Sequence, residues 1–531
     1  MTKVGLDFGT THSKISYFDP NGQLKLFRYP ASEGREFIPT AVSYYKDAVF
    51  IGSEAKSAYA NEEGVTYYQS PKMLLPIEND DDIVKQGWSR GKTPTEVTLD
   101  FLQKLLRTAT ESFINRVGSI EGLVVSVPEV WQQDVRNRGR EKLRKILQDD
   151  LELPLSQLIS EPVCAAAYYA YKYGQTHERL DWANLLVCDV GGGTFDVALC
   201  KVTEYETTVL GRRAKRYTIT VLDWDGTGRS GFNSAGVSYD HAVVLAAYHA
   251  AEGIEQNPSE SEFVDLLQQF EDTKIRMHDE ACIRFNEARQ RPALGDIPLY
   301  TVKRKYRVTV KQAQQAFIDI NKGITGILKT MRDRMSQNGW SIDRLAIVGG
   351  FGQFPLVEQA VLDCLGMDNH DQRFDRNLLL EDRLYAVAYG TALIANGIID
   401  PPVEYYPHTL GIIYTELLPV IREGFLPILI AGKSQSGQLA TTFATNESNE
   451  PIVFVVNNHT HPRSPVFLRV RGTSEPYEIK IADSNLPAQG RYHIGAYVDK
   501  SNLGWLVFRP VDGGKDVIYN LGDVNPIITR E

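Results

Sequence analysis

Two aspartates and three consecutive glycines stand close together in residues 185–199, between two apolar runs. Asp189 ends the first run and Asp196 lies in the second, so the pattern predicts a strand, a Gly-Gly-Gly-Thr turn and another strand. Glycines take backbone angles that other residues refuse, and a turn built from them can point its N–H groups at anionic oxygens. Two nearby carboxylates can hold magnesium through its waters or orient an attacking water. The combination suggests phosphate chemistry, although an ordinary hairpin with a flexible turn would also fit these residues.

The start of the chain repeats this pattern. Asp7 ends an apolar run, Gly9 follows, and the small polar turn Thr10, Thr11, His12 leads into another apolar run. Two copies far apart suggest a duplicated unit whose hairpins face each other across a cleft and hold one polyphosphate between them. Neither copy carries the lysine-bearing P-loop signature or the dinucleotide fingerprint, so the predicted phosphate site is of another kind.

A third glycine motif follows residues 345–348, where a buried strand is predicted to run into Gly349 and Gly350 and then into a helix. Glycines at this point would let a flat group approach the backbone. Together, the three spaced motifs resemble the actin-like ATPase superfamily, which includes sugar kinases, actins and the seventy-kilodalton heat-shock chaperones.

The closer resemblance is to the heat-shock chaperones, because four motifs occur in that family's order. They are Asp-Phe-Gly-Thr-Thr-His-Ser at 7–13, Val-Pro at 127–128, Glu-Pro-Val-Cys-Ala-Ala-Ala at 161–167 and Gly-Gly-Gly-Thr-Phe-Asp at 191–196. The resemblance implies a magnesium-dependent ATPase whose cofactors are ATP or ADP and Mg²⁺.

The same resemblance assigns roles to individual residues. The implied catalytic residues are Lys56, Glu161, Asp189 and Thr194, and the implied magnesium site contains Asp7, Asp189 and Asp196. The implied nucleotide contacts are Gly9, Thr10, Thr11, His12, Gly191, Gly192, Gly193, Thr194, Glu271, Lys274, His278, Gly349, Gly350 and Gln353. Other interpretations stay open: Lys56 as a solvated surface lysine, Glu161 as a helix-start carboxylate, and Glu271 with Lys274 as an exposed ion pair.

The chain departs from the family at two positions around the expected adenine. Ile275 and Gln353 stand where the family usually places arginines that sandwich the base. An arginine over an aromatic ring contributes about 0.5 to 2 kcal/mol. We therefore expect weaker adenine preference and affinity, with less effect on phosphate binding.

The composition is that of an ordinary globular chain of 531 residues, of which 43% are hydrophobic and 23% charged. The formal net charge of -10 argues against a protein that wraps nucleic acid or binds anionic membranes, since both need clustered lysine and arginine. The five cysteines are never spaced Cys-x-x-Cys and mostly lie in apolar runs, which predicts reduced core residues. No leader peptide and no apolar stretch of bilayer length are recognisable, so a cytoplasmic protein is expected.

We predict an α/β chain in three parts. Residues 1–397 form a two-lobed, duplicated actin-like ATPase fold, 398–408 form a proline-rich linker, and 409–531 form an all-β sandwich. The sandwich resembles the chaperones' peptide-binding domain, which implies a polypeptide client or protein partner and a possible co-chaperone. We do not expect the helical lid that members of this family carry. Because Pro401, Pro402 and Pro407 lack backbone N–H donors, we do not expect the docked strand that the family forms with its linker.

Three functions are compatible with these features. The leading interpretation is a chaperone-like ATPase whose C-terminal β domain engages a polypeptide. The second is a small-molecule kinase of the same superfamily, but the sequence shows no spare acid for a kinase's substrate pocket. The third is a nucleotide-gated scaffold with little turnover, in which the changes at Ile275 and Gln353 mark lost hydrolysis.

Overall fold

The computed structural model describes residues 2–29, 36–77, 79–85, 87–134, 137–209, 212–227, 235–253, 256–379, 381–416, 422–456, 466–469, 476–480, 487–521 and 525–527. Parts of the predicted sandwich, among them 417–421 and 457–465, lie outside these residues. The chain forms two compact units. The first contains Met1–Val130, Ile146–Leu155 and Ile159–Pro402, and the second contains Trp131–Lys145, Ser156–Leu158 and Val403–Glu531.

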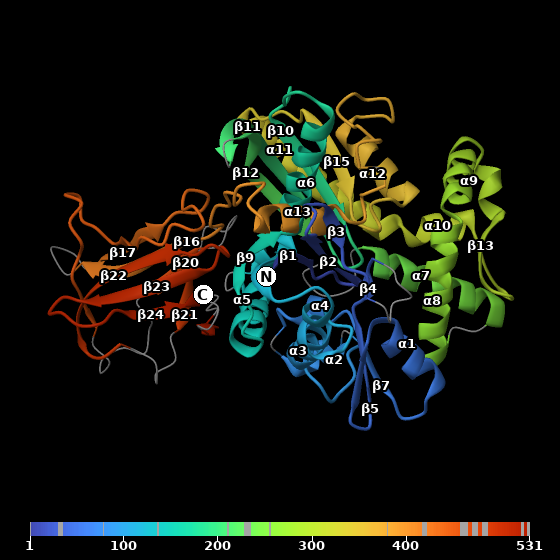
Figure 1. Cartoon of the computed structure of the whole chain (residues 1–531), viewed down its shortest axis with the longest axis horizontal. Helices are drawn as coiled ribbons and strands as arrows, with labels where there is room; N and C mark the ends of the chain where they lie inside the picture. Colours follow the sequence, from blue (N-terminus) through green and yellow to red (C-terminus); the bar gives the residue numbers. More distant parts are fainter. Residues whose placement is uncertain are drawn as a thin grey trace. The chain divides into compact units, whose positions relative to one another are not determined.

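The first sheet of the first unit is built around the hairpin that carries Asp7. Its strand order is β3-β2-β1-β8-β9, with β4 paired to β2 (Figure 1). Within it, β1 and β2 are antiparallel, β1 and β8 are parallel, and Asp7 lies opposite Lys14 on one side and Ser126 on the other. The strands are β1 (Thr2–Asp7), β2 (His12–Phe18), β3 (Leu24–Leu26), β4 (Ile38–Pro39), β8 (Ile120–Val127) and β9 (Leu155–Ser160).

The second sheet repeats this plan around Asp189. Its order is β12-β11-β10-β15, with β10 (Asn184–Val190), β11 (Phe195–Val209), β12 (Arg212–Thr227) and β15 (Arg344–Val348). Here β10 and β11 form the antiparallel hairpin, β10 and β15 are parallel, and Asp189 lies opposite Asp196 and Val348. Two sheets with the same hairpin and the same parallel neighbour confirm the predicted duplicated α/β fold.

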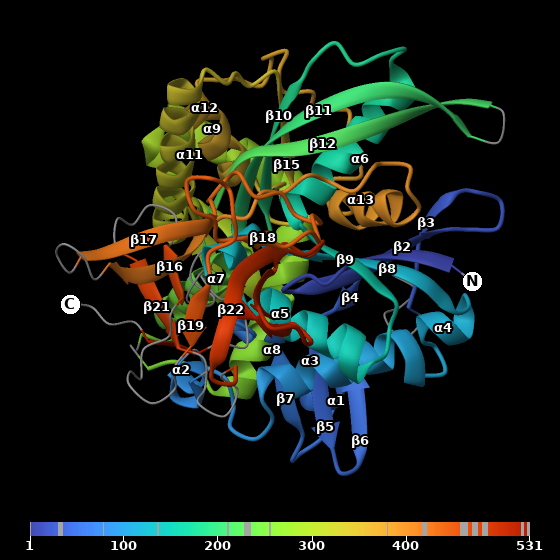
Figure 2. The same ribbon diagram turned by 90° about the vertical axis from the view of Figure 1, so that its left-hand side faces the viewer.

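The β11–β12 hairpin extends well beyond the other strands of the second sheet. β10 pairs with β11 only as far as Lys201, whereas β11 and β12 stay paired out to Val209 and Arg212, as a ribbon that Figure 2 shows in green. At the edge of β12, Ile399 forms one parallel bridge with Tyr217, and the Asp400 amide donates to the Tyr217 carbonyl at 3.0 Å. The prolines that follow Asp400 have no N–H to continue such pairing.

Two helices rich in small residues occupy the middle of the first unit. α6 (Glu161–Thr176) packs against β10 and β11, and α13 (Ala386–Ala395) packs against α6 and β1. A Cβ added to Gly390 would overlap the Cys164 carbonyl, so the two helices can approach this closely only where their residues are small. The contact of α6 with α13 thus links the second sheet, on which α6 packs, to the first sheet, on which α13 packs.

The remaining elements of the first unit form the outer parts of its two halves. A three-stranded sheet, β6-β5-β7, packs on α1 in the first half. The second half adds the hairpin β13-β14 and several helices, with a core that includes Tyr239, Phe270 and Leu328. The bounds are β5 (Ala41–Tyr45), β6 (Ala48–Ile51), β7 (Thr66–Gln69), α1 (Gly52–Asn61), α2 (Asp80–Lys85), α3 (Pro94–Gln103), α4 (Phe113–Arg116), β13 (Pro298–Lys303), β14 (Tyr306–Thr309), α7 (Gly236–Glu252), α8 (Glu260–Arg276), α9 (His278–Gln290), α10 (Val310–Ala316), α11 (Ile318–Asn338) and α12 (Pro355–Leu365).

The second unit is mostly β, as predicted. Its sheets run β17-β16-β20-β21-β25 and β18-β22-β23-β24, with β19 also paired to β22, and Ile412, Ile494 and Phe508 belong to its core. It also contains the segment Trp131–Lys145, with α5 (Arg138–Arg144), which the sequence did not assign to it. The strands are β16 (Thr409–Glu416), β17 (Arg422–Leu429), β18 (Thr442–Phe443), β19 (Phe454–Val456), β20 (Val466–Arg469), β21 (Pro476–Lys480), β22 (Gly490–Val498), β23 (Gly504–Pro510), β24 (Val517–Asn520) and β25 (Asn525–Ile527).

A buried polar network joins this segment to the β strands. The Arg140 side chain is fully buried, and its Nη1 donates to Glu404 Oε2 at 3.3 Å and to the Ser501 carbonyl at 3.0 Å. Asn502 Nδ2 donates to Gln132 Oε1 at 2.8 Å.

Among the helices that the structure describes, none combines the length and apolarity needed to cross a bilayer.

Candidate functional site

A cavity of about 520 Å³ opens in the first unit where the two hairpins meet. Its lining includes these residues predicted from the sequence: Asp7, Gly9, Thr10, Thr11, His12, Glu161, Asp189, Gly191, Gly192, Thr194, Glu271, Lys274, Gly349, Gly350 and Gln353. The predicted residues Lys56, Gly193, Asp196 and His278 are not in this lining. The structure therefore brings most of the proposed nucleotide contacts to one place, from both halves of the unit.

The glycines of the second hairpin allow the two hairpins to touch. A Cβ on Gly192 would overlap Thr11 Cγ2, and a Cβ on Gly193 would lie 2.8 Å from Thr10 Cγ2. No residue of Gly191–Gly193 has a positive φ. The expectation that these glycines supply unusual backbone angles is therefore wrong, and what they supply is room for the opposite hairpin.

Gly349 differs from these glycines. Its φ is +85°, and an added Cβ would lie 2.5 Å from both Asp189 Oδ1 and the Val190 carbonyl. This position therefore needs glycine both for its backbone angle and for the approach of the β10 carboxylate.

Asp7 is already paired inside the protein. Lys14 Nζ lies 2.8 Å from Asp7 Oδ2, and the Ser126 hydroxyl donates to Asp7 Oδ1 at 3.1 Å. All three residues are buried. Because its charge is balanced and both oxygens are bonded, Asp7 is a neutralised carboxylate at the floor of the cavity.

The second hairpin brings two buried carboxylates together, and the Thr194 hydroxyl and the charges of Lys14 and Lys72 compensate them only in part. Burial, together with the nearby Glu161 and Asp196 carboxylates, holds the pKa of Asp189 well above its usual range. Burial and the Glu161 charge raise the pKa of Asp196 to about 7. Asp196 Oδ1 accepts from the Val130 amide at 2.8 Å, whereas Asp196 Oδ2 is buried and has no hydrogen-bond partner. Two carboxylates opposite each other on neighbouring strands repel unless a cation lies between or near them.

These features test whether the residues fit a magnesium ion. Within the described residues, no group of three or more histidine, cysteine or acidic side chains is close enough to bind a metal directly. The unbonded Asp196 oxygen and the raised pKa values of Asp189 and Asp196 nevertheless fit a hydrated cation. Magnesium usually keeps several of its waters and binds to one or two carboxylates. The site thus fits magnesium held through water.

Lys72 is a residue of this site that the sequence analysis missed. It lies in the 3₁₀ turn Pro71–Leu74, its side chain is 1% exposed, and its Nζ bonds to Glu161 Oε1. Burial raises the pKa of Glu161, and the Lys72 charge opposes that effect. A lysine placed before the apolar run 73–75 is unusual for a surface residue, and this was the signal available in the sequence.

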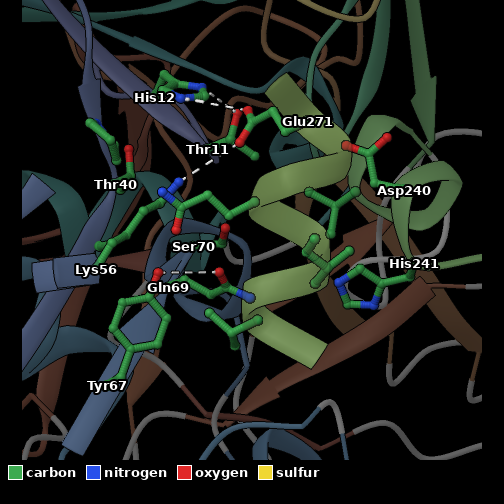
Figure 3. A pocket seen from close by; sticks show the side chains of 16 residues that line it. Thr11, His12, Thr40, Lys56, Tyr67, Gln69, Ser70, Asp240, His241 and Glu271 are labelled. Atoms are coloured by element: carbon green, nitrogen blue, oxygen red, sulfur yellow. Dashed lines mark hydrogen bonds and ion pairs between the residues drawn. The ribbon is translucent and has the colours of Figure 1, made fainter. Parts of the chain in front are cut away.

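Lys56 instead lines a second, smaller cavity of about 80 Å³ beside the first (Figure 3). Its Nζ lies 3.8 Å from Glu271 Oε2, and His12 Nε2 lies 3.7 Å from Glu271 Oε1. The lysine and the histidine thus approach the carboxylate of Glu271 on α8 from the first half of the unit. A catalytic role for Lys56 stays a prediction. His278 lies next to Cys282 on α9, with its Nε2 3.8 Å from the thiol sulfur.

The expected base end of the cavity is formed by the last turn of α8 and by the β15 glycine loop. Ile275 is 64% exposed and lines the cavity, as does the next residue, Arg276. Lys274 pairs with Asp240, which also lines the cavity, and its Nζ lies 2.6 and 2.8 Å from the two carboxylate oxygens. Burial raises the pKa of Asp240 to about 6. An arginine is therefore present at this end, one residue later than the family pattern implies.

Comparisons with known proteins agree with this geometry. The family profile of the Hsp70 protein matches residues 3–406. The chaperone protein DnaK of Stenotrophomonas maltophilia (strain R551-3) is 24% identical over 487 residues, which cover 85% of this chain and 68% of that protein. The chaperone protein HscA of Proteus mirabilis (strain HI4320) is 24% identical over 387 residues, which cover 68% of this chain and 53% of that protein. A family match over most of the chain, on a fold with paired hairpins and a shared cavity, shows that the chain belongs to the Hsp70 family.

Proposed function

We propose that this protein binds magnesium ATP in the cavity between its two hairpins and hydrolyses it, and that its β domain engages a polypeptide. The observation that carries the proposal is that both hairpins and Glu161, the buried partner of Lys72, line one cavity. Membership of the Hsp70 family and the similarity to two proteins named as chaperones support it. In this proposal, residues 1–397 are the ATPase domain, 398–408 the linker and 409–531 the client-binding domain.

The proposed chemistry needs positioning and charge balance more than covalent catalysis. The backbone N–H groups around Gly9 and of Gly191–Gly193 bind the phosphates from opposite sides. Thr194 and Asp189 orient the attacking water, and Asp189 accepts its proton. Lys72, held by Glu161, stabilises the charge that develops on the transferred phosphoryl group.

The carboxylates of the hairpins hold the metal. Asp7, Asp189 and Asp196 would hold a magnesium ion through its waters, and the ion would supply positive charge opposite the phosphates. The Val130 amide keeps Asp196 in place through the bond to Oδ1.

ATP hydrolysis by the purified full chain, with no added acceptor, tests the proposal. The chaperone-like ATPase releases phosphate under these conditions with a rate that depends on magnesium. A small-molecule kinase would release little phosphate under these conditions, and with its acceptor present it would form ADP and phosphorylated acceptor in place of free phosphate. A nucleotide-gated scaffold would bind ATP, measurable by calorimetry, without releasing phosphate over hours.

Peptide binding is tested separately. Fluorescently labelled unfolded polypeptide should bind the full chain and change polarisation, and magnesium ATP should change the rate at which it leaves. Polypeptide that fails to bind at micromolar protein would contradict the client-binding part of the proposal and leave the ATPase part untouched.

A further inference from the structure

Glu129 is a buried carboxylate that the proposed reaction does not use. It is 1% exposed and opens the 3₁₀ turn Glu129–Gln133, two residues after β8 ends at Val127. Its Oε2 accepts a hydrogen bond from the hydroxyl of Ser160, which is fully buried. A buried carboxylate is stable only where hydrogen bonds or opposite charge compensate its lost hydration, so the bond from Ser160 is part of what keeps it in place.

The bond joins the ends of two neighbouring strands of the first sheet, β8 and β9. Each strand continues directly into a group of the candidate site. Beyond β8, the amide of Val130 donates to Asp196. Beyond β9, Glu161 begins α6 and bonds to Lys72. Glu129 therefore directly precedes Val130 in the sequence, and Ser160 directly precedes Glu161.

Ser160 occupies the N-cap position of α6, yet its side chain makes no capping bond to the helix. A serine at this position ordinarily accepts a hydrogen bond from the first turn of its helix. Here its hydroxyl is turned to Glu129 instead. The start of α6 is thus tied to the end of β8, and a negative charge close to a helix N-terminus also suits the helix dipole.

We propose that Glu129 is a positioning residue for ATP hydrolysis. By holding Ser160, Glu129 fixes the position of Glu161, the first residue of α6, and through Glu161 the position of Lys72 Nζ. Because Glu129 directly precedes Val130, it also fixes the position of the Val130 amide that donates to Asp196. This inference rests on the proposed ATPase function. Glu129 does not line the cavity and touches no nucleotide in this account.

The expected effect is on turnover more than on binding. A shift of about 1 Å in catalytic groups can lower a rate about a hundredfold, whereas the proposed phosphate cradle is made by the backbones of the two hairpins, to which Glu129 does not belong. Glu129→Ala should therefore lower kcat at least tenfold and change KM less than threefold. Glu129→Gln keeps an oxygen that accepts the Ser160 bond, so its kcat should stay within threefold of the wild type.

Asp343 supplies a matched control. Asp343 also accepts a hydrogen bond from a serine hydroxyl, that of Ser341 at 3.0 Å, and it accepts bonds from the amides of Ala183 and Asn184. These residues lie where β10 and β15 begin, at the ends of the strands away from Asp189. Asp343→Ala removes the same kind of carboxylate bond far from the cavity. Its kcat should remain within twofold of the wild type even where thermal stability falls.

The closing experiment measures two readouts on the full chain: ATP turnover, and binding of magnesium ADP with and without aluminium fluoride, which mimics the transferring phosphoryl group. In Glu129→Ala, affinity in the presence of fluoride should fall at least tenfold, while affinity for magnesium ADP alone changes less than threefold. Ser160→Ala should reproduce this pattern, and it decides the question if Glu129→Ala does not fold.

Three outcomes separate the possibilities. Wild-type turnover in Ser160→Ala or Glu129→Ala would overturn the positioning role. So would a Glu129→Gln variant as slow as Glu129→Ala, because the hydrogen bond would then not be what positions the site. A wild-type chain that neither releases phosphate nor binds magnesium ADP more tightly with fluoride would overturn the proposed ATPase function itself.

Discussion

The two hairpins share one backbone plan and differ in how their carboxylates are balanced. In the first, Asp7 bonds to Lys14 and Ser126, and no strong charge is left over. In the second, Asp189 and Asp196 lie opposite each other in register, and one buried oxygen of Asp196 has no partner. The carboxylate of the first hairpin is paired with a cation of the protein, whereas those of the second are only partly compensated and keep raised pKa values.

This difference assigns different tasks to two similar structures. The first hairpin supplies a stable floor and backbone N–H groups for the cavity. In the proposed function, the second supplies the partly compensated carboxylates that would hold the magnesium ion, and the hydroxyl of Thr194. Because the two contact each other through Gly192 and Gly193, a change in one should be measurable in the other.

The largest effect should come from breaking the balanced hairpin. Asp7→Asn leaves the buried Lys14 ammonium without its partner and should lower the free energy of unfolding by about 3 kcal/mol. Denaturant unfolding of the nucleotide-free protein measures the change. A stability equal to that of the wild type would show that Asp7 and Lys14 do not form a structural pair.

The same substitution in the second hairpin should act in the opposite direction. Asp196→Asn removes a buried, repelled charge, so the metal-free protein should gain on the order of 1–2 kcal/mol of stability at pH 7.5. Its Asp196 pKa of about 7 lies above the unfolded value, so the wild type loses stability as pH rises towards 7.

The advantage of the variant should accordingly narrow as pH falls from 7.5 towards 5, where the wild-type carboxyl is already protonated in the folded state. Unfolding curves at the two pH values, recorded with a chelator, provide the test. A variant less stable than the wild type at pH 7.5 would contradict the claim that this carboxylate is only partly compensated.

A smaller effect is expected where the hairpins touch. Gly192→Ala adds a methyl group that overlaps Thr11 and should push the hairpins apart. The affinity for magnesium ATP should then fall about tenfold, or about 1.4 kcal/mol. Gly191→Ala is the control, because its nearest atom would be the Thr194 carbonyl at 3.9 Å. Calorimetric titration of both variants distinguishes close packing from a general need for glycine, which would weaken both equally.

The smallest effect concerns the base, which neither hairpin contacts in this account. Gln353→Arg should raise the affinity for ATP about three- to tenfold, because it adds a cation over the base, and should leave the affinity for tripolyphosphate unchanged. Equal tightening of both ligands would mean that the new charge acts on the phosphates. Arg276, which already lines this end, should limit the gain.

The local parts of the site could be read from the sequence because each hairpin is a continuous stretch. Apolar runs, an aspartate and a glycine turn specify Asp7 and Asp189 at the ends of their strands without knowledge of distant contacts. The reason for the glycines could not be predicted, since Gly192 is required by the approach of Thr11 in the turn of the other hairpin.

Residues that depend on distant contacts were harder to place. Whether Lys56 or Lys72 pairs with Glu161 depends on the turn Pro71–Leu74 and on the position of Glu161, which is 89 residues beyond Lys72. Nor does any local pattern reveal that Arg140 is buried against Glu404, 264 residues away, so the segment Trp131–Lys145 could not be assigned to the second unit. Pairings of this range arise from the fold and not from local propensity.

The most direct test of the account is single-turnover ATP hydrolysis by the full chain, with wild type and Asp189→Asn compared on preparations whose magnesium ATP binding is measured in parallel. The account predicts that Asp189→Asn still binds magnesium ATP, because the backbone cradle is unchanged, and hydrolyses it at least tenfold more slowly. Equal hydrolysis rates in the two proteins would contradict the claim that the second hairpin's partly compensated carboxylates carry the reaction.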